Sequence, residues 1–132
     1  MRQAAAKQGD QILALDTHIV LVQAGPALVP TALPHPFTGI INDSLSSNVN
    51  IMKKPAATVD STADNTPAHL PTLPGQSFQN APTNLATITG GSASVKINGK
   101  AAARNADAAE TCNDPKDEAV GLVVAVGSVL IG

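Results

Sequence analysis

Short runs in which β-branched residues alternate with other side chains recur along the chain. Three of them share a Val-x-Ile pattern, at residues 49–51, 95–97 and 129–131. A period of two residues with β-branched side chains is typical of strands. Ten Gly and ten Pro favour turns and irregular backbone over long helices. The pattern therefore predicts a mainly β fold made of short strands.

Three further segments, rich in small residues, are variations on one another. We call residues 4–10 (AAAKQGD), 55–61 (PAATVDS) and 101–107 (AAARNAD) the alanine segments. The third follows its strand through Asn98-Gly99, a strong hairpin signal because both central residues must reach positive φ. Before the second, Lys53 takes the place of the Gly. We expect a distorted or longer connection there.

The third repeat is divided between the two ends of the chain. The strand at 129–131 stops at Gly132 without a return strand, and the alanine segment at 4–10 has no strand before it. We predict that these two pieces form one unit, that the termini lie close together, and that the repeat is cyclic. Small Ala side chains fit where three segments meet at an axis. A helix is the alternative for such segments, but Pro55 and the Asn-Gly turn disfavour it.

The remaining stretches are expected to connect the units within one domain, residues 1–132. Residues 24–47 and 62–91 each carry four prolines and are predicted to be long ordered loops or partner-binding surface. A short helix is predicted at 114–120, with Asp114 as its N-cap and Pro115 at its first position.

The composition limits both the core and the partners. Trp and Tyr are absent and only two Phe occur, so aliphatic side chains must fill a small core, which a metal or a partner would help to stabilise. The net charge is −2, and the eight Lys and Arg are scattered along the sequence, so nucleic-acid binding is not expected. Asp10 and Asp16 interrupt the N-terminal apolar run, so no signal peptide is expected. The apolar tail at 120–132 is shorter than the ~20 residues that span a bilayer.

Metal-capable side chains follow each alanine segment at similar distances. His18 and His69 each lie fourteen residues after the start of their segment, and Cys112 lies eleven after its own. His35, between two prolines, is the remaining His. Three imidazoles and one thiolate suit tetrahedral zinc. The alternatives are a packed or reactive thiol, because a single Cys forms no internal disulfide, and a solvent-exposed loop His35. Asp16 is either an acceptor that orients His18 or a turn residue.

Four protein ligands would close the site, whereas a catalytic metal needs an open position for water. The chain has no HExxH, GxSxG, P-loop or dinucleotide-binding motif. We therefore expect a structural protein that is not an enzyme. The alternatives from other classes are a zinc-dependent hydrolase and a metal-free adhesion or binding module.

The unit at residues 94–104 (SVKINGKAAAR) resembles the PAAR-repeat proteins, which cap the spike of contractile injection systems such as type VI secretion and related phage-tail-like particles. The resemblance covers nearly the whole chain, including the closing GSVLIG at 127–132, although no segment reads Pro-Ala-Ala-Arg literally. It implies a small cone-shaped pseudo-threefold β domain with at most short helices. It also implies one structural zinc, rather than iron, near the tip, held by three His and one Cys: His18, His35, His69 and Cys112.

The same resemblance implies the partners. The broad base would sit on a homotrimeric VgrG-like spike, with one copy per trimer, and the sharp tip would touch the target membrane transiently and aid its puncture. An effector or other cargo would attach separately, through the proline-rich stretches. The protein would be made and assembled in the cytoplasm and then be carried out of the cell with the spike.

Overall fold

The computed structural model describes residues 2–71, 75–114 and 119–132. Throughout these ranges the chain consists of strands, turns and irregular backbone, so the prediction of a mainly β fold is confirmed. Among these residues, none forms a helix that is long and apolar enough to cross a membrane. The helix predicted at 114–120 falls mostly on 115–118, outside the described residues. The strands are β1 (Gln3–Ala4), β2 (Gln11–Ala24), β3 (Ala27–Asp43), β4 (Asn50–Ile51), β5 (Lys54–Pro55), β6 (Thr62–Asn65), β7 (Gly75–Phe78), β8 (Leu85–Ile88), β9 (Lys96–Ile97), β10 (Lys100–Ala101), β11 (Ala108–Glu110), β12 (Gly121–Val124) and β13 (Leu130–Ile131).

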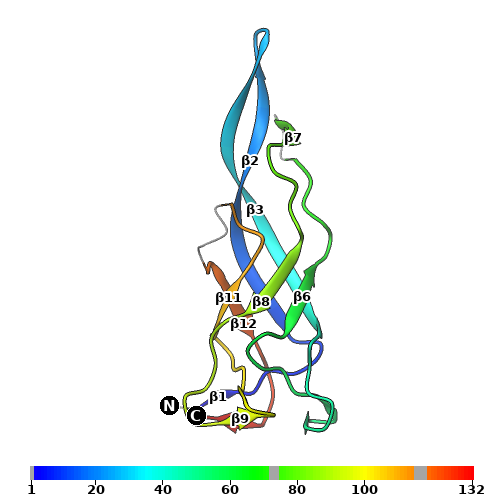
Figure 1. The fold of residues 1–132 in the computed structure, drawn as a ribbon, viewed down its shortest axis with the longest axis vertical. Helices are drawn as coiled ribbons and strands as arrows, with labels where there is room; N and C mark the ends of the chain where they lie inside the picture. Colours follow the sequence, from blue (N-terminus) through cyan, green and yellow to red (C-terminus); the bar gives the residue numbers. More distant parts are fainter. Residues whose placement is uncertain (1, 72–74, 115–118) are drawn as a thin grey trace.

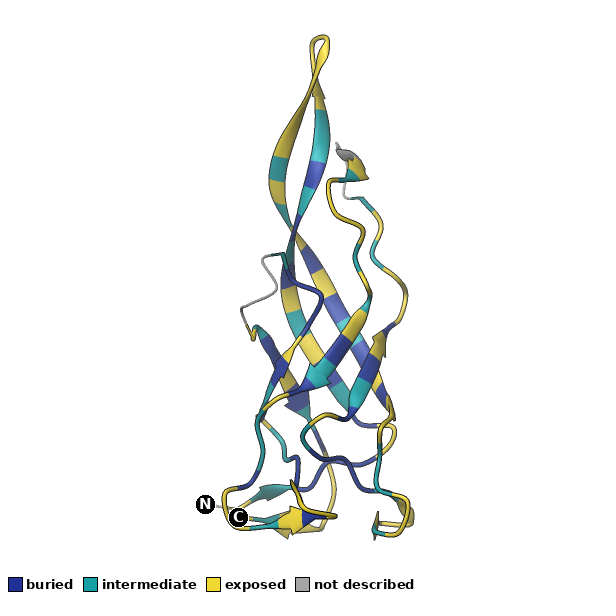
Figure 2. Cartoon of the chain, in the orientation of Figure 1, coloured by how far each residue is buried: buried dark blue, intermediate teal, exposed yellow. Residues whose placement is uncertain are grey.

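The body of the molecule is a closed ring of antiparallel strands. The strands pair in the order β12-β11-β8-β6-β3-β2, and β12 pairs with β2 to close the ring, while β7 adds to the outer part of β2. Buried side chains alternate with exposed ones along these strands and form an aliphatic core inside the ring (Figure 2). The core contains Phe37, Ile12, Ile41, Ile88 and Val123 together with several Ala.

A long hairpin extends from this ring and gives the molecule its elongated shape (Figure 1). Strands β2 and β3 pair without interruption from Gln11 and Ile40 to Ala24 and Ala27. The hairpin turns through Gly25, at φ 61°, and Pro26, as expected where Gly takes the first central position of a two-residue turn.

The prediction that residues 24–47 form a loop is wrong for most of the stretch, because β3 runs through it. Ala24 and Ala27, which flank the turn, form a hydrogen-bonded pair, and such pairs recur at every second residue of the hairpin. Every even-numbered residue of β3 therefore belongs to a pair without these hydrogen bonds and directs its N–H away from β2. The prolines at positions 30, 34 and 36 take such places, where a missing N–H costs no hydrogen bond within the hairpin. The second proline-rich stretch is also partly strand, because it contains β6, β7 and β8.

Three small hairpins lie at the opposite end of the molecule, together with both termini (Figure 1). Two are continuous in sequence, β4–β5 and β9–β10, and the third joins β13 to β1. Their registers correspond, because Ile51 faces Lys54, Ile97 faces Lys100 and Ile131 faces Gln3. The predicted unit assembled from both chain ends is therefore confirmed.

The turn at Met52-Lys53 is regular, so the prediction of a distorted or longer connection is wrong. Met52 and Lys53 have φ values of 51° and 70°, close to the 54° and 80° of Asn98 and Gly99. The register imposed by the repeat keeps Lys53 in the left-handed region, which a non-glycine residue adopts at a cost of ~1 kcal/mol.

The three alanine segments meet at an axis. The N–H of Ala6 donates to the carbonyl of Ala103 at 2.9 Å, that of Ala103 to Ala57 at 3.1 Å, and that of Ala57 to Ala6 at 3.0 Å. These residues, which we call the alanine ring, are fully buried. A closed cycle of three hydrogen bonds leaves no room for larger side chains, which explains why the segments are rich in Ala.

Candidate metal centre

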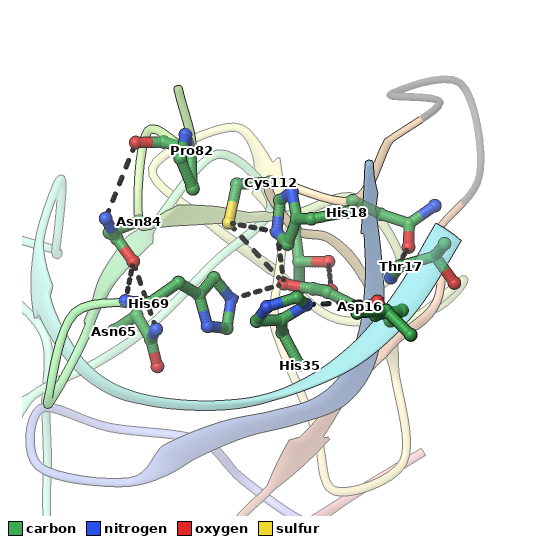
Figure 3. Close-up of polar contacts among 12 residues, drawn as sticks. Asp16, Thr17, His18, His35, Asn65, His69, Pro82, Asn84 and Cys112 are labelled. Carbon is green, nitrogen blue, oxygen red and sulfur yellow. Dashed lines mark hydrogen bonds and ion pairs between the residues drawn. The ribbon is translucent and has the colours of Figure 1, made fainter. Parts of the chain in front are cut away.

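Four metal-capable side chains come together between the alanine ring and the end of the long hairpin. Asp16 and His18 are two residues apart on β2 and so point to the same face, while His69 follows β6 and Cys112 follows β11. All four are buried, and one potential ligand atom from each lies within 4.8 Å of the others (Figure 3). We call them the metal-capable cluster. Each of the three repeats contributes to it, as the spacing predicts.

The distances within the cluster fit a tetrahedral ion. Oδ2 of Asp16 lies 3.1 Å from Nε2 of His69, 3.5 Å from Sγ of Cys112 and 3.9 Å from Nε2 of His18. Sγ of Cys112 lies 3.7 Å from Nε2 of His18. Four ligands at bonds of ~2.0–2.3 Å from one zinc ion are separated by about 3.3–3.8 Å. The distances of 3.1–3.9 Å are close to this range, so the cluster could hold a metal ion.

His35 lies beside the cluster but is not one of its four members. It faces Asp16 in the β2–β3 register, and its ring centroid is 5.3 Å from that of His18 and 5.5 Å from that of His69. The rings of His18 and His69 are 4.9 Å apart. Three imidazoles on one ion have centroids about 5 Å apart, given bonds of ~2 Å. The ring spacing thus also fits a centre that includes His35.

His35 is a buried strand residue, so the alternative of a solvent-exposed loop residue is wrong. Its Nδ1 lies 3.0 Å from the carbonyl of Leu33. If Nδ1–H donates there, the lone pair is on Nε2, an arrangement common among metal-binding His.

Neighbouring side chains hold the cluster in place. The hydroxyl of Thr111 donates to Oδ1 of Asp16. The backbone N–H of His69 donates to Oδ1 of Asn84 at 2.8 Å, and that amide also accepts from Asn65 at 3.1 Å. Such partners fix the orientation of metal ligands.

Both Phe residues of the chain contact the His rings. Phe78 packs against His18 and His35, with centroid distances of 5.6 and 5.3 Å, and Phe37 packs against His69 at 6.1 Å. These contacts limit the orientations open to the rings.

Burial shapes the protonation of the cluster. It lowers the pKa of His18 below its ordinary value, and the neighbouring His69 adds to the effect. Burial also raises the pKa of the Cys112 thiol to about 11, and the negative Asp16 carboxylate strengthens the shift. A bound divalent cation would oppose the shift at Cys112 and favour its thiolate, and it would add to the preference of His18 for the neutral imidazole.

Two surface pockets reach this region from different sides. One is lined by His18, Cys112 and residues 80–83, and the other by His35, His69 and residues 65–68 among others. They provide paths by which an ion could enter.

Of the four ligands predicted from the sequence, the structure brings His18, His69 and Cys112 into the cluster and His35 to its side. Asp16 was expected only as an orienting acceptor or a turn residue, yet it is fully buried and central. Its place two residues before His18 on a strand is the signal that puts both side chains on one face.

A ring of three hairpins with a buried His, Cys and Asp cluster defines a small β domain built from three similar units. The chain matches the PAAR motif family over residues 32–112, more than half of its length, and it belongs to that family. The match includes His35, His69 and Cys112, as well as the second and third alanine segments. No curated protein and no solved structure matches the chain.

Proposed function

We propose that the protein is the metal-stabilised tip that caps the trimeric, VgrG-like spike of a contractile injection system. The observation that carries this proposal is the threefold arrangement of β4–β5, β9–β10 and β13–β1 at one end of a single chain. A single copy can contact all three subunits of a homotrimer in the same way only if it offers a similar surface to each of them. These hairpins supply that surface, and PAAR motif membership supports the role.

We further propose that one zinc ion is held by His18, His35, His69 and Cys112, with Asp16 as the carboxylate that orients them. Imidazole and thiolate donors suit zinc better than iron in a closed tetrahedral site. When bound, a structural zinc contributes on the order of 10–16 kcal/mol to folding in small domains. Here it would tie together residues from all three repeats, in a domain whose core contains a single buried Phe.

The same ligand set supports a structural role for the protein, not a catalytic one. Four protein ligands, with the Asp16 carboxylate as a fifth group nearby, leave no open position at which water could be activated.

The long hairpin is the part that would meet the target membrane. Residues 17–42 contain no Asp, Glu, Lys or Arg, and Leu28 and Val29 are exposed near its end. Entry of this segment into lipid would therefore desolvate no charged side chain. It lies at the opposite end of the molecule from the three small hairpins (Figure 1).

Cargo would attach to the side of the body. Residues 66–71 and 79–84 are irregular, and Leu70 is 77 % exposed there. An effector bound to this face would leave both the hairpin and the base accessible. Assembly in the cytoplasm and release with the spike follow from this role.

The test is to mix the purified protein with the trimeric spike protein of its own injection system and to weigh the complex by native mass spectrometry. One copy per trimer is expected. A metal-stripped sample and Cys112→Ser serve as comparisons for the contribution of the ion. Absence of any complex with metal-loaded, folded protein would refute the proposed function.

A further inference from the structure

The fold separates the charges of the chain into two regions. We define the base segments as residues 44–59, 89–104 and 125–132 with 2–9, which form the three hairpins and the first part of each alanine segment, ending before Asp10, Asp60 and Asp107. They contain seven of the eight Lys and Arg residues and no Asp or Glu. All ten acidic residues lie elsewhere in the sequence. Charges that are scattered along the sequence are thus collected at one end by the cyclic fold.

Two of the seven cations are used inside the structure. Nζ of Lys7 lies 3.1 Å from Asp10, and the guanidinium of Arg104 lies 2.8 Å from Asp107. These pairs occupy equivalent positions in two repeats, where Thr58 and Ser61 form the corresponding neutral pair. They stabilise the alanine segments.

The other five cations are exposed on the hairpins. They are Arg2, Lys53, Lys54, Lys96 and Lys100. Lys100 lies 3.4 Å from Asp60 in an exposed pair, which is worth little in water. Over the part of the chain that the structure describes, no ion pair is found for the other four. This end of the molecule therefore carries uncompensated positive charge.

All three hairpins carry cations, although not at every equivalent position, because Gln3 stands in the third hairpin where Lys54 and Lys100 stand in the other two. Lys53 and Lys54 belong to the first hairpin, Lys96 and Lys100 to the second, and Arg2 directly precedes β1 of the third. Lys54 and Lys100 occupy the same register position, opposite Ile51 and Ile97.

An apolar cluster lies within this basic rim. Ile51 and Ile97 pack with Ala5, Ala56 and Ala102, and Val49, Val95 and Ile131 pack against them. This cluster is buried or partly buried, while Met52, Val129 and Leu130 of the same hairpins are exposed and give this end apolar surface beside the cations. An apolar centre with a polar rim is the usual anatomy of a protein–protein interface. Nucleic acid and lipid surfaces have no threefold arrangement that would match such a centre.

We propose that the spike end on which this base sits carries a threefold set of carboxylates around an apolar centre, and that the five exposed cations pair with them. This inference rests on the proposed function and names the chemistry of the partner surface. Complementary rim charges act mainly by raising the association rate, and their effect declines as salt screens them.

The test compares two variants with the same change in net charge. Lys53→Gln with Lys100→Gln removes two base cations, whereas Gln23→Glu with Gln79→Glu adds two negative charges at exposed positions away from the base. Association with the immobilised spike trimer is measured at low and at high salt. Thermal unfolding and metal content of each variant show that the fold is retained.

We expect the base variant to associate about tenfold more slowly than the wild type at low salt and to lose much of the salt dependence, while the control stays within about twofold. Equal rates for the two variants, with a 1:1 ratio of cap to trimer intact, would overturn the charge proposal and leave the proposed function standing. No binding by the wild-type protein would instead refute the proposed function. Duplex DNA and vesicles of anionic lipid are tested in parallel. If they bind the wild type as tightly as the spike does, the base is a general anion surface and the proposal is wrong.

Discussion

Asp16 and His35 face each other across β2 and β3, and a single substitution at each tests which one is the fourth metal ligand. If His35 is a ligand, the His35→Gln variant should bind less than one tightly held ion per chain. Asp16→Asn should keep the ion but bind it about 10–100-fold more weakly, as expected for an orienting partner. Metal titration against a competing chelator measures both. Loss of the ion in Asp16→Asn with full retention in His35→Gln would assign the fourth place to Asp16.

Acid should destabilise the metal-free protein through His18. Burial holds the pKa of His18 below its ordinary value, whereas the unfolded chain has a His pKa of about 6.5. The unfolded state therefore binds more protons just below that pH, so the free energy of unfolding should decrease as pH falls through 6.5.

Denaturation midpoints of the chelator-treated protein between pH 8 and pH 5.5 measure this effect. His18→Gln, treated in the same way, should show a shallower dependence because it lacks the buried imidazole. A wild-type midpoint that stays constant over this range would contradict the prediction.

At the level of single residues, the sequence was sufficient to identify three members of the cluster, because His18, His69 and Cys112 occupy similar places after the alanine segments. It could not decide the role of Asp16. A carboxylate near a His is equally consistent with a turn, and only the strand register places it beside the other metal-capable side chains.

At the level of the elements, the turns of the small hairpins allow a measurement of the free energy that a non-glycine residue loses in the left-handed conformation. Gly99 has φ 80° and no atom within 4 Å of an added Cβ, so Gly99→Ala should change little except backbone strain. We expect a loss of about 1 kcal/mol in the free energy of unfolding. Lys53→Gly, at the equivalent position, should be neutral or stabilising by up to about 1 kcal/mol, because it relieves the same strain. Chemical denaturation of both variants provides the values, and a stabilising Gly99→Ala would contradict this view of the turns.

The long hairpin is the element that the sequence predicted least well. The four prolines between 24 and 47 predict a loop, because proline is disfavoured in the middle of a sheet. The prolines of β3 at positions 30, 34 and 36 are tolerated because their missing N–H groups face away from β2. That alternation depends on the position of the turn at Gly25 and Pro26, and a Gly-Pro pair alone does not say which strands its turn joins.

For the molecule as a whole, the cyclic repeat predicts that the position of the chain ends can be moved. A circular permutant that joins Gly132 to Met1 through a short linker and begins at Gly99 should fold and bind the same amount of metal. In this permutant the β13–β1 hairpin becomes continuous, and the β9–β10 hairpin is divided between the new chain ends. The exchange should be tolerated because the two hairpins have the same register. A permutant opened between Ile12 and Leu13 should fail to fold, because β2 closes the ring of strands there.

Metal content and the cooperativity of thermal unfolding compare the two permutants. If the permutant that begins at Gly99 stays unfolded while the wild type folds under the same conditions, the three units are not equivalent in the way the register indicates.

The distribution of charge is likewise a property of the whole molecule. The eight cations show no cluster in the sequence, but the three base segments are distant in sequence and adjacent in space, so seven of them gather at one end. The cyclic closure can be predicted from the divided third unit, whereas the basic surface that results from it follows only once the three segments are placed side by side.

X-ray absorption at the zinc edge of the purified protein tests the central claim most directly, namely that three repeats join on one ion. The account predicts one zinc per chain with one sulfur at about 2.3 Å and three nitrogen ligands at about 2.0 Å. A Cys112→Ser sample should lose the sulfur signal. A wild-type spectrum without sulfur, or folded protein that holds no tightly bound metal after exposure to zinc, would contradict the account.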